Sequence, residues 1–466
     1  MKEEFRRRVL AAILIMSMLV LPVKVSAAEI SNVFHDAVSK AEQRLDGKIN
    51  AGPSETEVTG TQDKNSIQSA IEDNIKSTGN NYPVILVHGL FGWGNDEVLG
   101  KNYWGWDSSI RDMLNSEGFE VYTPTVGPIS SNWDRACELY TYLVGGTVDY
   151  GQAHAEKYGH SRYGRTYPGV LKNLGTIDEN GNVKKIHLMG HSMGGETSRV
   201  LAQLLENGSL EEVARTGENT SPLFTGGKHW IESITTITTP HDGSQFDEVQ
   251  NDLEPYFHRF VAALAAHSGG LDEEDVVYDF KMEQWGLKKN PGESQESYVN
   301  RVFSSNIWRK DNKDLSLWDL SLEGAAELNS FAKVQSDIYY FSISCTDTHK
   351  SLLSNHQLPN INMDPLIRYS ATVMGRYTEN RPGRIPVDST WFENDGLVSK
   401  RSGIGPHSGS SDKIVNFNGT PQIGVWNYLG NISNVDHLEI IFLRQPWDKA
   451  YLQNEYRTWV KMVRSL

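Results

Sequence analysis

The chain has 466 residues, 38% of them hydrophobic and 22% charged, and its formal net charge is −15. This composition is that of a globular protein, and the length suits either two or three domains or one elaborated α/β core. Strong acidity argues against nucleic-acid partners. Two cysteines, Cys137 and Cys345, exclude a disulfide-rich scaffold. Because Cys137 falls in the helical pattern NWDRACELYTYL, we expect a free buried thiol there.

Residues 1–27 have the three parts of a secretory signal peptide. A basic region precedes an apolar run from Val9 to Val23, and the small residues before position 28 resemble a cleavage site. A membrane anchor is the alternative, but the run is short for a span. Cleavage after Ala27 removes five basic and two acidic residues, which leaves a mature chain of formal net charge −18. We therefore expect a secreted, extracellular protein.

Residues 28–80 are mostly polar, and we interpret them as an N-terminal extension or linker. From residue 81 the strand and helix patterns alternate, beginning with PVILVHG, an apolar run typical of a strand buried on both faces. Further strand candidates are FEVYTPTV, KKIHLMG, IESITTITTP, DIYYFSISC and DKIVNFNGT, and helical candidates are WDSSIRDMLNSEG and GGETSRVLAQLLENG. The alternation predicts an α/β fold over residues 81–466, with a mostly parallel central sheet flanked by helices. Insertions at about 130–170 and 242–335 are long enough to carry function or cover a site.

The segment KKIHLMGHSMGG places Ser192 between two glycines, after a strand and before a helix. This is the pattern of a nucleophile elbow, in which small neighbours allow a sharp turn that exposes the serine hydroxyl. The Met193 N–H would then face a developing oxyanion. We expect the second oxyanion donor in the loop HGLFGWG, from the N–H of Leu90 or, next in line, Phe91. An ordinary tight turn is the alternative.

The acid and the base of such a hydrolase follow the serine in chain order. The histidines weighed as the base are His241, His258, His349, His356, His407 and His437. We favour His437, which lies near the C-terminus in NISNVDHLEII, a loop leading into an apolar helix-like run. His241 precedes any plausible acid, and His407 lies in a polar loop with little to hold it. Asp395 in WFENDGLVSK is the candidate acid, with an ordinary Asp-Gly turn as the alternative.

These residues and several longer segments resemble the secreted lipases of Bacillus, Geobacillus and Staphylococcus. The segments are VILVHGLFGWG, SSNWDRACELY, LVGGTVDYGQAHAEKYGHSRYGRTYPG, GHSMGGET, TTPHDGS, YDFKMEQWGL, ENDGLV and NVDHLE. The resemblance runs from about residue 82 to residue 460. It implies an α/β-hydrolase fold, triacylglycerol lipase activity, and Ser192, Asp395 and His437 as the catalytic triad.

The resemblance also implies a structural zinc. Its ligands carry over to Asp134, His154 and His160, together with either Asp314, which aligns best, or Asp311. Two histidines and two carboxylates suit a closed tetrahedral zinc site. Surface histidines in a polar insertion are the alternative.

Calcium is where the chain departs from the family pattern. Glu439 fits one carboxylate ligand, but Arg444 falls where an aspartate is expected, and a cation there would repel calcium. The site is therefore doubtful, unless Asp364 and Asp436 rebuild it with a backbone carbonyl near Asn362.

A helical lid is expected in SQFDEVQNDLEPYFHRFVAALAAH. Its apolar positions near helical spacing are Phe246, Val249, Leu253, Phe257, Phe260, Val261 and Leu264. A core-facing helix is the alternative. The expected substrate is lipid at an oil–water interface, with no protein partner evident. A phospholipase or short-chain esterase of the same fold, or a non-catalytic secreted binding protein, are the other functions to weigh.

Overall fold

The computed structural model describes residues 79–466 apart from 95–101, 107, 246–278, 280, 289, 295–296, 298–299, 302–303, 310, 366, 444–445 and 447. The predicted signal peptide, nearly all of the N-terminal extension and the predicted lid positions lie outside the described residues. The chain divides into two compact units, one of residues 1–55 and 249–312 and one of residues 56–248 and 313–466.

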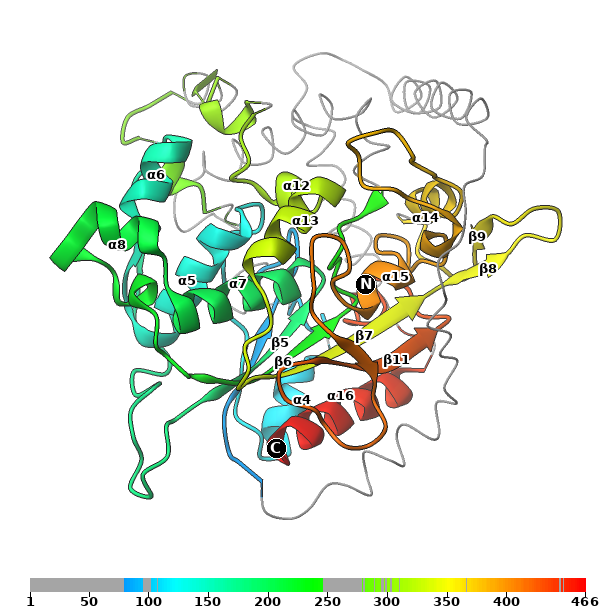
Figure 1. The fold of residues 1–466 in the computed structure, drawn as a ribbon, viewed down its shortest axis with the longest axis horizontal. Helices are drawn as coiled ribbons and strands as arrows, with labels where there is room; N and C mark the ends of the chain where they lie inside the picture. Colours follow the sequence, from blue (N-terminus) through cyan, green and yellow to red (C-terminus); the bar gives the residue numbers. More distant parts are fainter. Residues whose placement is uncertain are drawn as a thin grey trace. The chain divides into compact units, whose positions relative to one another are not determined.

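A seven-stranded sheet forms the centre of the larger unit (Figure 1). Its strand order is β10-β11-β7-β6-β5-β1-β2, and every neighbouring pair runs parallel. The strands are β1 (Val84–Val87), β2 (Val121–Tyr122), β5 (Ile186–His191), β6 (Ile231–Ile237), β7 (Tyr339–Thr346), β10 (Ile414–Asn416) and β11 (Trp426–Ser433). The predicted α/β fold with a mostly parallel sheet is confirmed, and six of these strands coincide with predicted segments.

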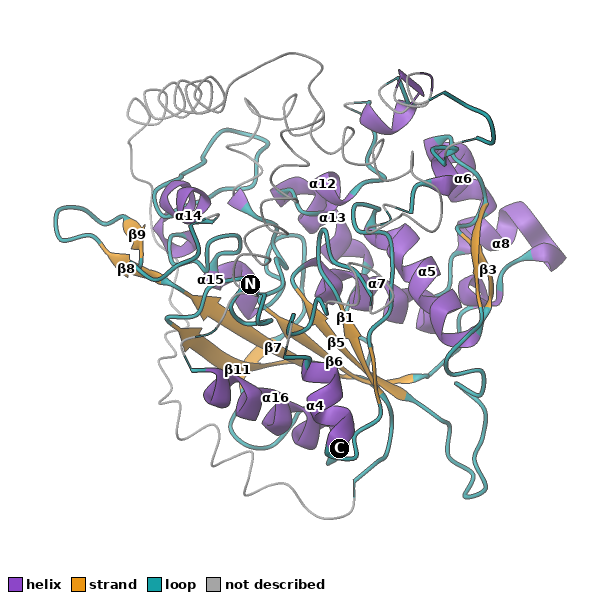
Figure 2. Cartoon of the chain, turned by 180° about the vertical axis from the view of Figure 1, so that it is seen from behind, coloured by secondary structure: helices purple, strands orange, loops and turns teal. Residues whose placement is uncertain are grey.

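Helices cover both faces of the sheet, as parallel strands require. The helices α5 (Asn132–Val144) and α7 (Met193–Asn207) lie over one face, and α4 (Ile110–Ser116) and α16 (Lys449–Arg464) lie over the other (Figure 2). The other α-helices among the described residues of this unit are α6 (Gln152–Tyr158), α8 (Leu210–Thr216), α12 (Ser316–Asp319), α13 (Leu322–Phe331), α14 (Arg368–Met374) and α15 (Lys400–Ile404). Its 3₁₀ helices are η2 (Gly217–Asn219), η3 (Pro222–Thr225) and η7 (Ser389–Trp391).

The main core lies between the sheet and helices α5 and α7. β1 and β5 are buried along their whole length, which explains their continuous apolar runs. The cluster also includes Leu139 and Leu143 from α5 and Leu201 and Leu204 from α7. Cys137 on α5 and Cys345 on β7 are buried free thiols, as expected for Cys137.

The insertion after α5 forms a small antiparallel sheet of its own. β3 (Gly146–Asp149) pairs with β4 (Tyr163–Tyr167), and α6 lies between them in sequence. A second two-stranded sheet pairs β8 (Thr348–Lys350) with β9 (Gln357–Pro359). The described part of the smaller unit, within residues 279–312, contains η5 (Glu283–Trp285) and η6 (Asn306–Trp308) and an ion pair of 2.7 Å between Arg301 and Glu293.

Glu138 on α5 is a buried carboxyl with two donors. It accepts from the Gly127 N–H and from the Tyr150 hydroxyl, the latter at 2.8 Å. Burial raises the pKa of Glu138 to about 7, although nearby Arg165 opposes the shift. The folded protein therefore holds this proton more tightly than the unfolded chain does.

Glu138→Gln should change how stability depends on pH. A carboxyl whose pKa is raised on folding contributes stability below its ordinary pKa, and this contribution is lost as the pH rises through 7. Relative to the wild type, the Gln variant should gain about 2–3 kcal/mol between pH 5 and pH 8. Thermal unfolding of both proteins across this range measures the difference, and groups common to both proteins cancel. Parallel pH profiles for the two proteins would contradict the assignment.

Candidate active site and metal centre

Ser192 occupies a strained turn between β5 and α7. Its backbone has φ 54° and ψ −133°, a left-handed conformation that non-glycine residues adopt at a cost. The flanking glycines make the turn possible: a Cβ on Gly190 would lie 2.4 Å from the Gly195 nitrogen, and one on Gly194 would lie 2.1 Å from the Val87 oxygen. The predicted strand–turn–helix context of the serine is therefore present in the structure.

Asp395 and His437 meet although 42 positions separate them. The His437 Nδ1–H donates to Asp395 Oδ2 at 2.8 Å, and both side chains are buried. The other carboxylate oxygen, Oδ1, accepts from the N–H groups of Leu397 and Val398 at 3.0 and 2.8 Å. These bonds fix the position of the carboxylate and hold the imidazole in one tautomer, with Nε2 left to accept a proton. Asp395 thus has a specific partner beyond an Asp-Gly turn.

His437 also lies against the residue that precedes the serine. Its ring packs on His191 with a centroid separation of 4.6 Å. The helix-like run expected after His437 is instead a series of turns, because Phe442 has φ 57° and the Leu443 N–H bonds back to Leu438 O at 3.1 Å. The loop therefore turns sharply beneath the histidine.

Thr238 belongs to this group and was missed by the sequence analysis. It follows β6, has φ 43°, and its hydroxyl donates to Asp395 Oδ2. The threonine-rich run ITTITTP gave no sign of which hydroxyl would face the acid. A bent residue at the end of a strand is a weak sequence signal, because the bend shows only in the backbone.

The two predicted oxyanion donors are the backbone amides of Met193 and Leu90. The Met193 N–H is the first of α7, so it has no carbonyl one turn earlier within the helix. In the loop after β1, the Phe91 N–H already bonds to Pro128 O at 2.9 Å, which favours Leu90 over Phe91 as the second donor. The helix N-terminus adds favourable potential for negative charge.

Two of the other histidines considered for the general base, His241 and His407, bond to partners outside the Asp395–His437 pair. His241 is buried against Trp426 and bonds to Thr236 Oγ1 at 2.9 Å. His407, expected to have little to hold it, bonds to Asp242 Oδ2 at 3.0 Å through Nδ1. His258 lies outside the described residues.

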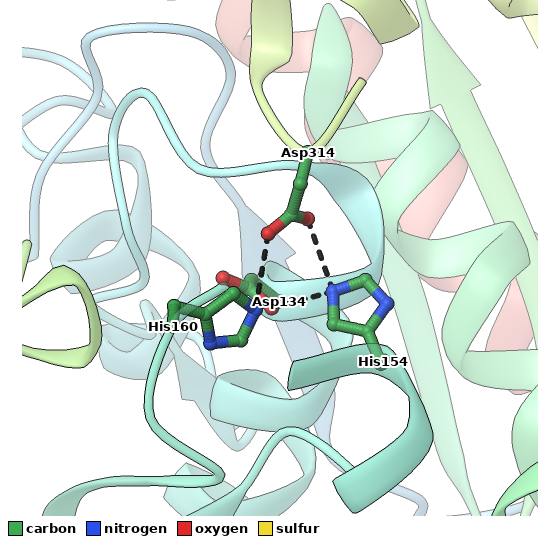
Figure 3. Close-up of side chains that lie close together, drawn as sticks. All are labelled: Asp134, His154, His160 and Asp314. Carbon is green, nitrogen blue, oxygen red and sulfur yellow. Dashed lines mark hydrogen bonds and ion pairs between the residues drawn. The ribbon is translucent and has the colours of Figure 1, made fainter. Parts of the chain in front are cut away.

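Four residues of the larger unit lie close together and form a quartet of potential metal ligands: Asp134, His154, His160 and Asp314 (Figure 3). One ligand atom from each residue lies within 4.8 Å of the others. The separation from His154 Nε2 is 3.3 Å to Asp134 Oδ1 and 3.1 Å to Asp314 Oδ1, and His160 Nε2 lies 3.2 Å from Asp314 Oδ2. Ligand atoms around a tetrahedral zinc lie about 3.3–3.6 Å apart, given bonds of about 2.0–2.2 Å. The donor set and its spacing therefore fit zinc.

Neighbouring groups orient these ligands. The His160 Nδ1–H donates to Ser161 O at 2.9 Å, which leaves Nε2 as the lone-pair atom facing the quartet. Trp133 stacks on the His154 ring at 5.0 Å and 9°. Burial alone would lower the pKa of His154, but the carboxylates of Asp314 and Asp134 raise it to about 10. Without a metal, protonated histidines of the quartet therefore supply the positive charge that a bound cation would supply.

Asp314, rather than Asp311, joins the quartet. Asp311 lies in the smaller unit, where its exposed carboxylate pairs with Arg309. Within the described residues a second cluster of three or more potential metal ligands contains Glu206, His229 and Asp337. Its imidazole is exposed and bonds to both carboxylates as a surface ion pair does.

Glu439, proposed for calcium, is buried in the turn after His437. Asp436 beside it already accepts from three backbone N–H groups, those of Asp364, Leu438 and Glu439. Arg444 lies outside the described residues. Calcium binding by Glu439 therefore stays a doubtful prediction.

A cavity of about 270 Å³ opens beside the quartet and is lined in part by His154 and Asp314. Its lining includes residues of α5, α6 and α13. No helix within the described part of the chain is long and apolar enough to cross a membrane.

Residues 80–463 match the family model described as the lipase-like, C-terminal domain. A lipase of Staphylococcus epidermidis is 37% identical over 411 residues, which cover 85% of this chain and 56% of that relative. The chain thus spans little more than half the length of such relatives. Among solved structures, EstA from Clostridium botulinum is 43% identical with a TM-score of 0.74, covering 92% of this chain and 98% of that one. Staphylococcus hyicus lipase is 34% identical with a TM-score of 0.71, covering 82% and 96%. The expected resemblance to staphylococcal lipases is confirmed, and the chain belongs to the family of lipase-like C-terminal domains with an α/β-hydrolase fold.

Proposed function

We propose that this protein is a triacylglycerol lipase that cleaves the carboxylic ester bonds of acylglycerols through a serine-bound acyl intermediate. The observation that carries this proposal is the buried Asp395–His437 pair, joined at 2.8 Å, beside the strained turn that presents Ser192. Matches to proteins named lipase in Staphylococcus support the same reaction class.

In the first half of the reaction, His437 Nε2 takes the proton of the Ser192 hydroxyl as its oxygen attacks the ester carbonyl. Asp395 stabilises the imidazolium that forms. The amides of Met193 and Leu90 bind the oxyanion, and the intermediate collapses when His437 donates its proton to the departing alcohol. An acyl ester on Ser192 remains.

In the second half, His437 removes a proton from water, which attacks the acyl ester. The second tetrahedral intermediate uses the same two amides. Its collapse returns the proton to Ser192 and releases the fatty acid. Both halves use the same base, and water is the nucleophile in the second half.

Zinc has a structural role in this proposal and takes no part in the steps above. When bound, it would cross-link four segments of the chain and neutralise their two buried carboxylates. Asp134 comes from the first turn of α5, His154 from α6, His160 from the loop after α6, and Asp314 from the segment before α12. The ion would thus tie the insertion after α5 to the chain that returns near residue 313.

The proposed setting is extracellular, with lipid at an oil–water interface as substrate. The signal-peptide pattern of residues 1–27 and the lid pattern around 246–264 support this setting. A lid helix that opens against lipid would couple activity to the interface.

The test compares turnover of emulsified long-chain triacylglycerol with turnover of soluble short-chain esters and phospholipid by the mature protein. Faster turnover of the emulsion, with a rise in rate at the solubility limit, is expected of a lipase. Activity confined to soluble short esters would assign the protein to the carboxylesterases. No turnover of any ester, with no labelling of Ser192 by a serine-reactive phosphonate, would leave a non-catalytic binding protein as the better account.

A further inference from the structure

Tyr103 connects the loop after β1 to the nucleophile strand. Its buried hydroxyl accepts from the Gly89 N–H at 3.1 Å and lies 2.7 Å from His191 Nδ1. His191, the residue before Ser192, is also buried, and its Nε2 lies 3.1 Å from the backbone oxygen of His437. Four groups from distant parts of the chain thus form one hydrogen-bonded series.

The direction of each hydrogen bond in the series is determined by the groups themselves. A backbone oxygen only accepts, so His191 Nε2 must carry the proton that bonds to His437 O. Burial lowers the pKa of His191 well below its usual range, so its ring is neutral and Nδ1 accepts from the Tyr103 hydroxyl. That hydroxyl is then free to accept from the Gly89 N–H. Every donor in the series meets one acceptor.

At its first end, the series fixes the orientation of the Gly89–Leu90 peptide, which carries the proposed oxyanion donor. The Gly89 carbonyl accepts from His88 Nδ1 at 2.9 Å and from the Gly92 N–H at 3.1 Å. The Leu90 N–H belongs to the same planar peptide and points the opposite way. Since Tyr103 holds the Gly89 N–H, the two peptides on either side of Gly89 are both fixed in orientation. A Cβ on Gly89 would lie 2.7 Å from Ser192 Cβ, so this peptide packs directly on the nucleophile.

The second end of the series holds the histidine loop. His191 bonds to the backbone of His437, while the His437 N–H bonds to Asp395 O at 3.0 Å. The backbone of the proposed base is therefore held on both sides, and one of these contacts depends on His191. Aromatic packing reinforces the arrangement, because Trp93, Trp104 and His88 all contact the Tyr103 ring.

From this geometry we infer that the Tyr103 hydroxyl, through its contacts with Gly89 and His191, positions two loops relative to Ser192. These are the loop after β1, which carries the Leu90 N–H, and the loop that carries His437. This inference rests on the proposed hydrolase function. Tyr103 acts through the Gly89 N–H and the His191 ring, and His191 acts through the backbone oxygen of His437 and through the packing of its ring on the His437 ring. The series matters most when negative charge forms on the carbonyl oxygen, since preorganised donors stabilise that charge.

Tyr103→Phe removes the hydroxyl and keeps the ring. On a soluble ester, we expect kcat to fall by about 10- to 100-fold with KM within twofold of wild type, less than the loss of a whole oxyanion donor. Affinity for an alkylboronic acid, which forms a tetrahedral anion on the serine, should fall by a similar factor. Affinity for the alkanol of the same chain length should stay unchanged. A merely structural role for Tyr103 would move the two affinities together or move neither.

Tyr340→Phe is the matched control. Its buried hydroxyl accepts from the Gln335 N–H at 2.9 Å, away from this series. We expect a similar loss of thermal stability in both variants but a loss of kcat only in Tyr103→Phe. Equal kcat values for wild type and Tyr103→Phe, or equal losses in both variants, would overturn the inference.

His191→Asn tests the other end and replaces Tyr103→Phe if that variant does not fold. The shorter amide keeps a partner for Tyr103 but cannot reach His437 O. We expect His191→Asn to lower kcat and leave KM unchanged. In the double variant that combines Tyr103→Phe with His191→Asn, the fold-loss of kcat should be smaller than the product of the two single losses, because both residues act through one series. An unchanged kcat, or a multiplicative double loss, would count against it. Wild-type protein that neither turns over esters nor reacts with a phosphonate would overturn the proposed function itself, a separate outcome.

Discussion

Ser192→Ala should lower ester hydrolysis by about 10⁴-fold or more while the protein stays folded. Alanine keeps the Cβ that the strained turn already accommodates, so the backbone at φ 54° needs no change. The hydroxyl that attacks the carbonyl is lost, and neither His437 nor the oxyanion amides can replace it. The measurement is the initial rate on the best ester found for the wild type, together with phosphonate labelling and mass spectrometry.

Ser233→Ala is a control of the same chemical change. Ser233 lies on β6, is buried, and bonds to His187 Nδ1 at 2.8 Å. Its loss should lower thermal stability without removing activity or labelling. If Ser192→Ala keeps more than a hundredth of the wild-type rate, another nucleophile is responsible and the triad assignment is wrong.

Asp314→Asn should abolish stable zinc binding and lower the melting temperature by about 5 °C or more. The substitution removes one of the two carboxylate charges among the four ligands, so we expect zinc affinity to fall by about 100-fold or more. It also leaves His154 and His160 with only one carboxylate, in a buried site where each protonated imidazole needs a partner. Metal analysis after dialysis, paired with calorimetry, reports both effects.

Asp311→Asn is the matched control, because this nearby aspartate is exposed and paired with Arg309. It should keep one zinc per chain and the wild-type melting temperature. Loss of zinc from Asp311→Asn, with retention in Asp314→Asn, would reverse the ligand assignment.

Zinc affinity of the wild type should rise with pH across the neutral range. The metal-free pKa of His154 is about 10, so zinc must displace a proton there at pH 7. For each proton that zinc displaces, the apparent zinc affinity rises by at most about tenfold per pH unit. Competition with a chromophoric chelator from pH 6 to pH 9 measures the slope, and a flat profile would contradict histidine ligation.

Local sequence patterns predicted the elements whose character is local. β1 and β5 are buried on both faces, so their apolar runs identified them, and Gly-x-Ser-x-Gly marked the elbow because only small residues fit that turn. β11 was not predicted. Its sequence WNYLGNIS has no apolar run, and a bulge interrupts its register between Tyr428 and Gly430. It is a strand because β7 on one side and β10 on the other supply its hydrogen-bond partners, with help from the Asn427 side chain bonded to Tyr340 O at 3.0 Å.

The resemblance to a family, carried by long shared segments, was needed for the metal quartet and for raising Asp395 above an ordinary turn. Spacing could not supply either one, since 180 positions separate Asp134 from Asp314, and many aspartates lie in loops. Thr238, Tyr103 and His191 were missed for a related reason. A hydroxyl or a buried imidazole has no pattern that names its partner.

By itself, then, the sequence predicted the fold class, which the structure confirms, and the strand–turn–helix setting of the candidate nucleophile, because strand burial and tight turns depend on neighbouring residues. The tertiary structure showed that Asp395 faces His437 and that Asp314 completes the quartet, as the family resemblance implied, and it alone revealed which hydroxyl holds the loop after β1. Those contacts join segments far apart in sequence, and their geometry exists only once the parallel sheet brings the ends of its strands together.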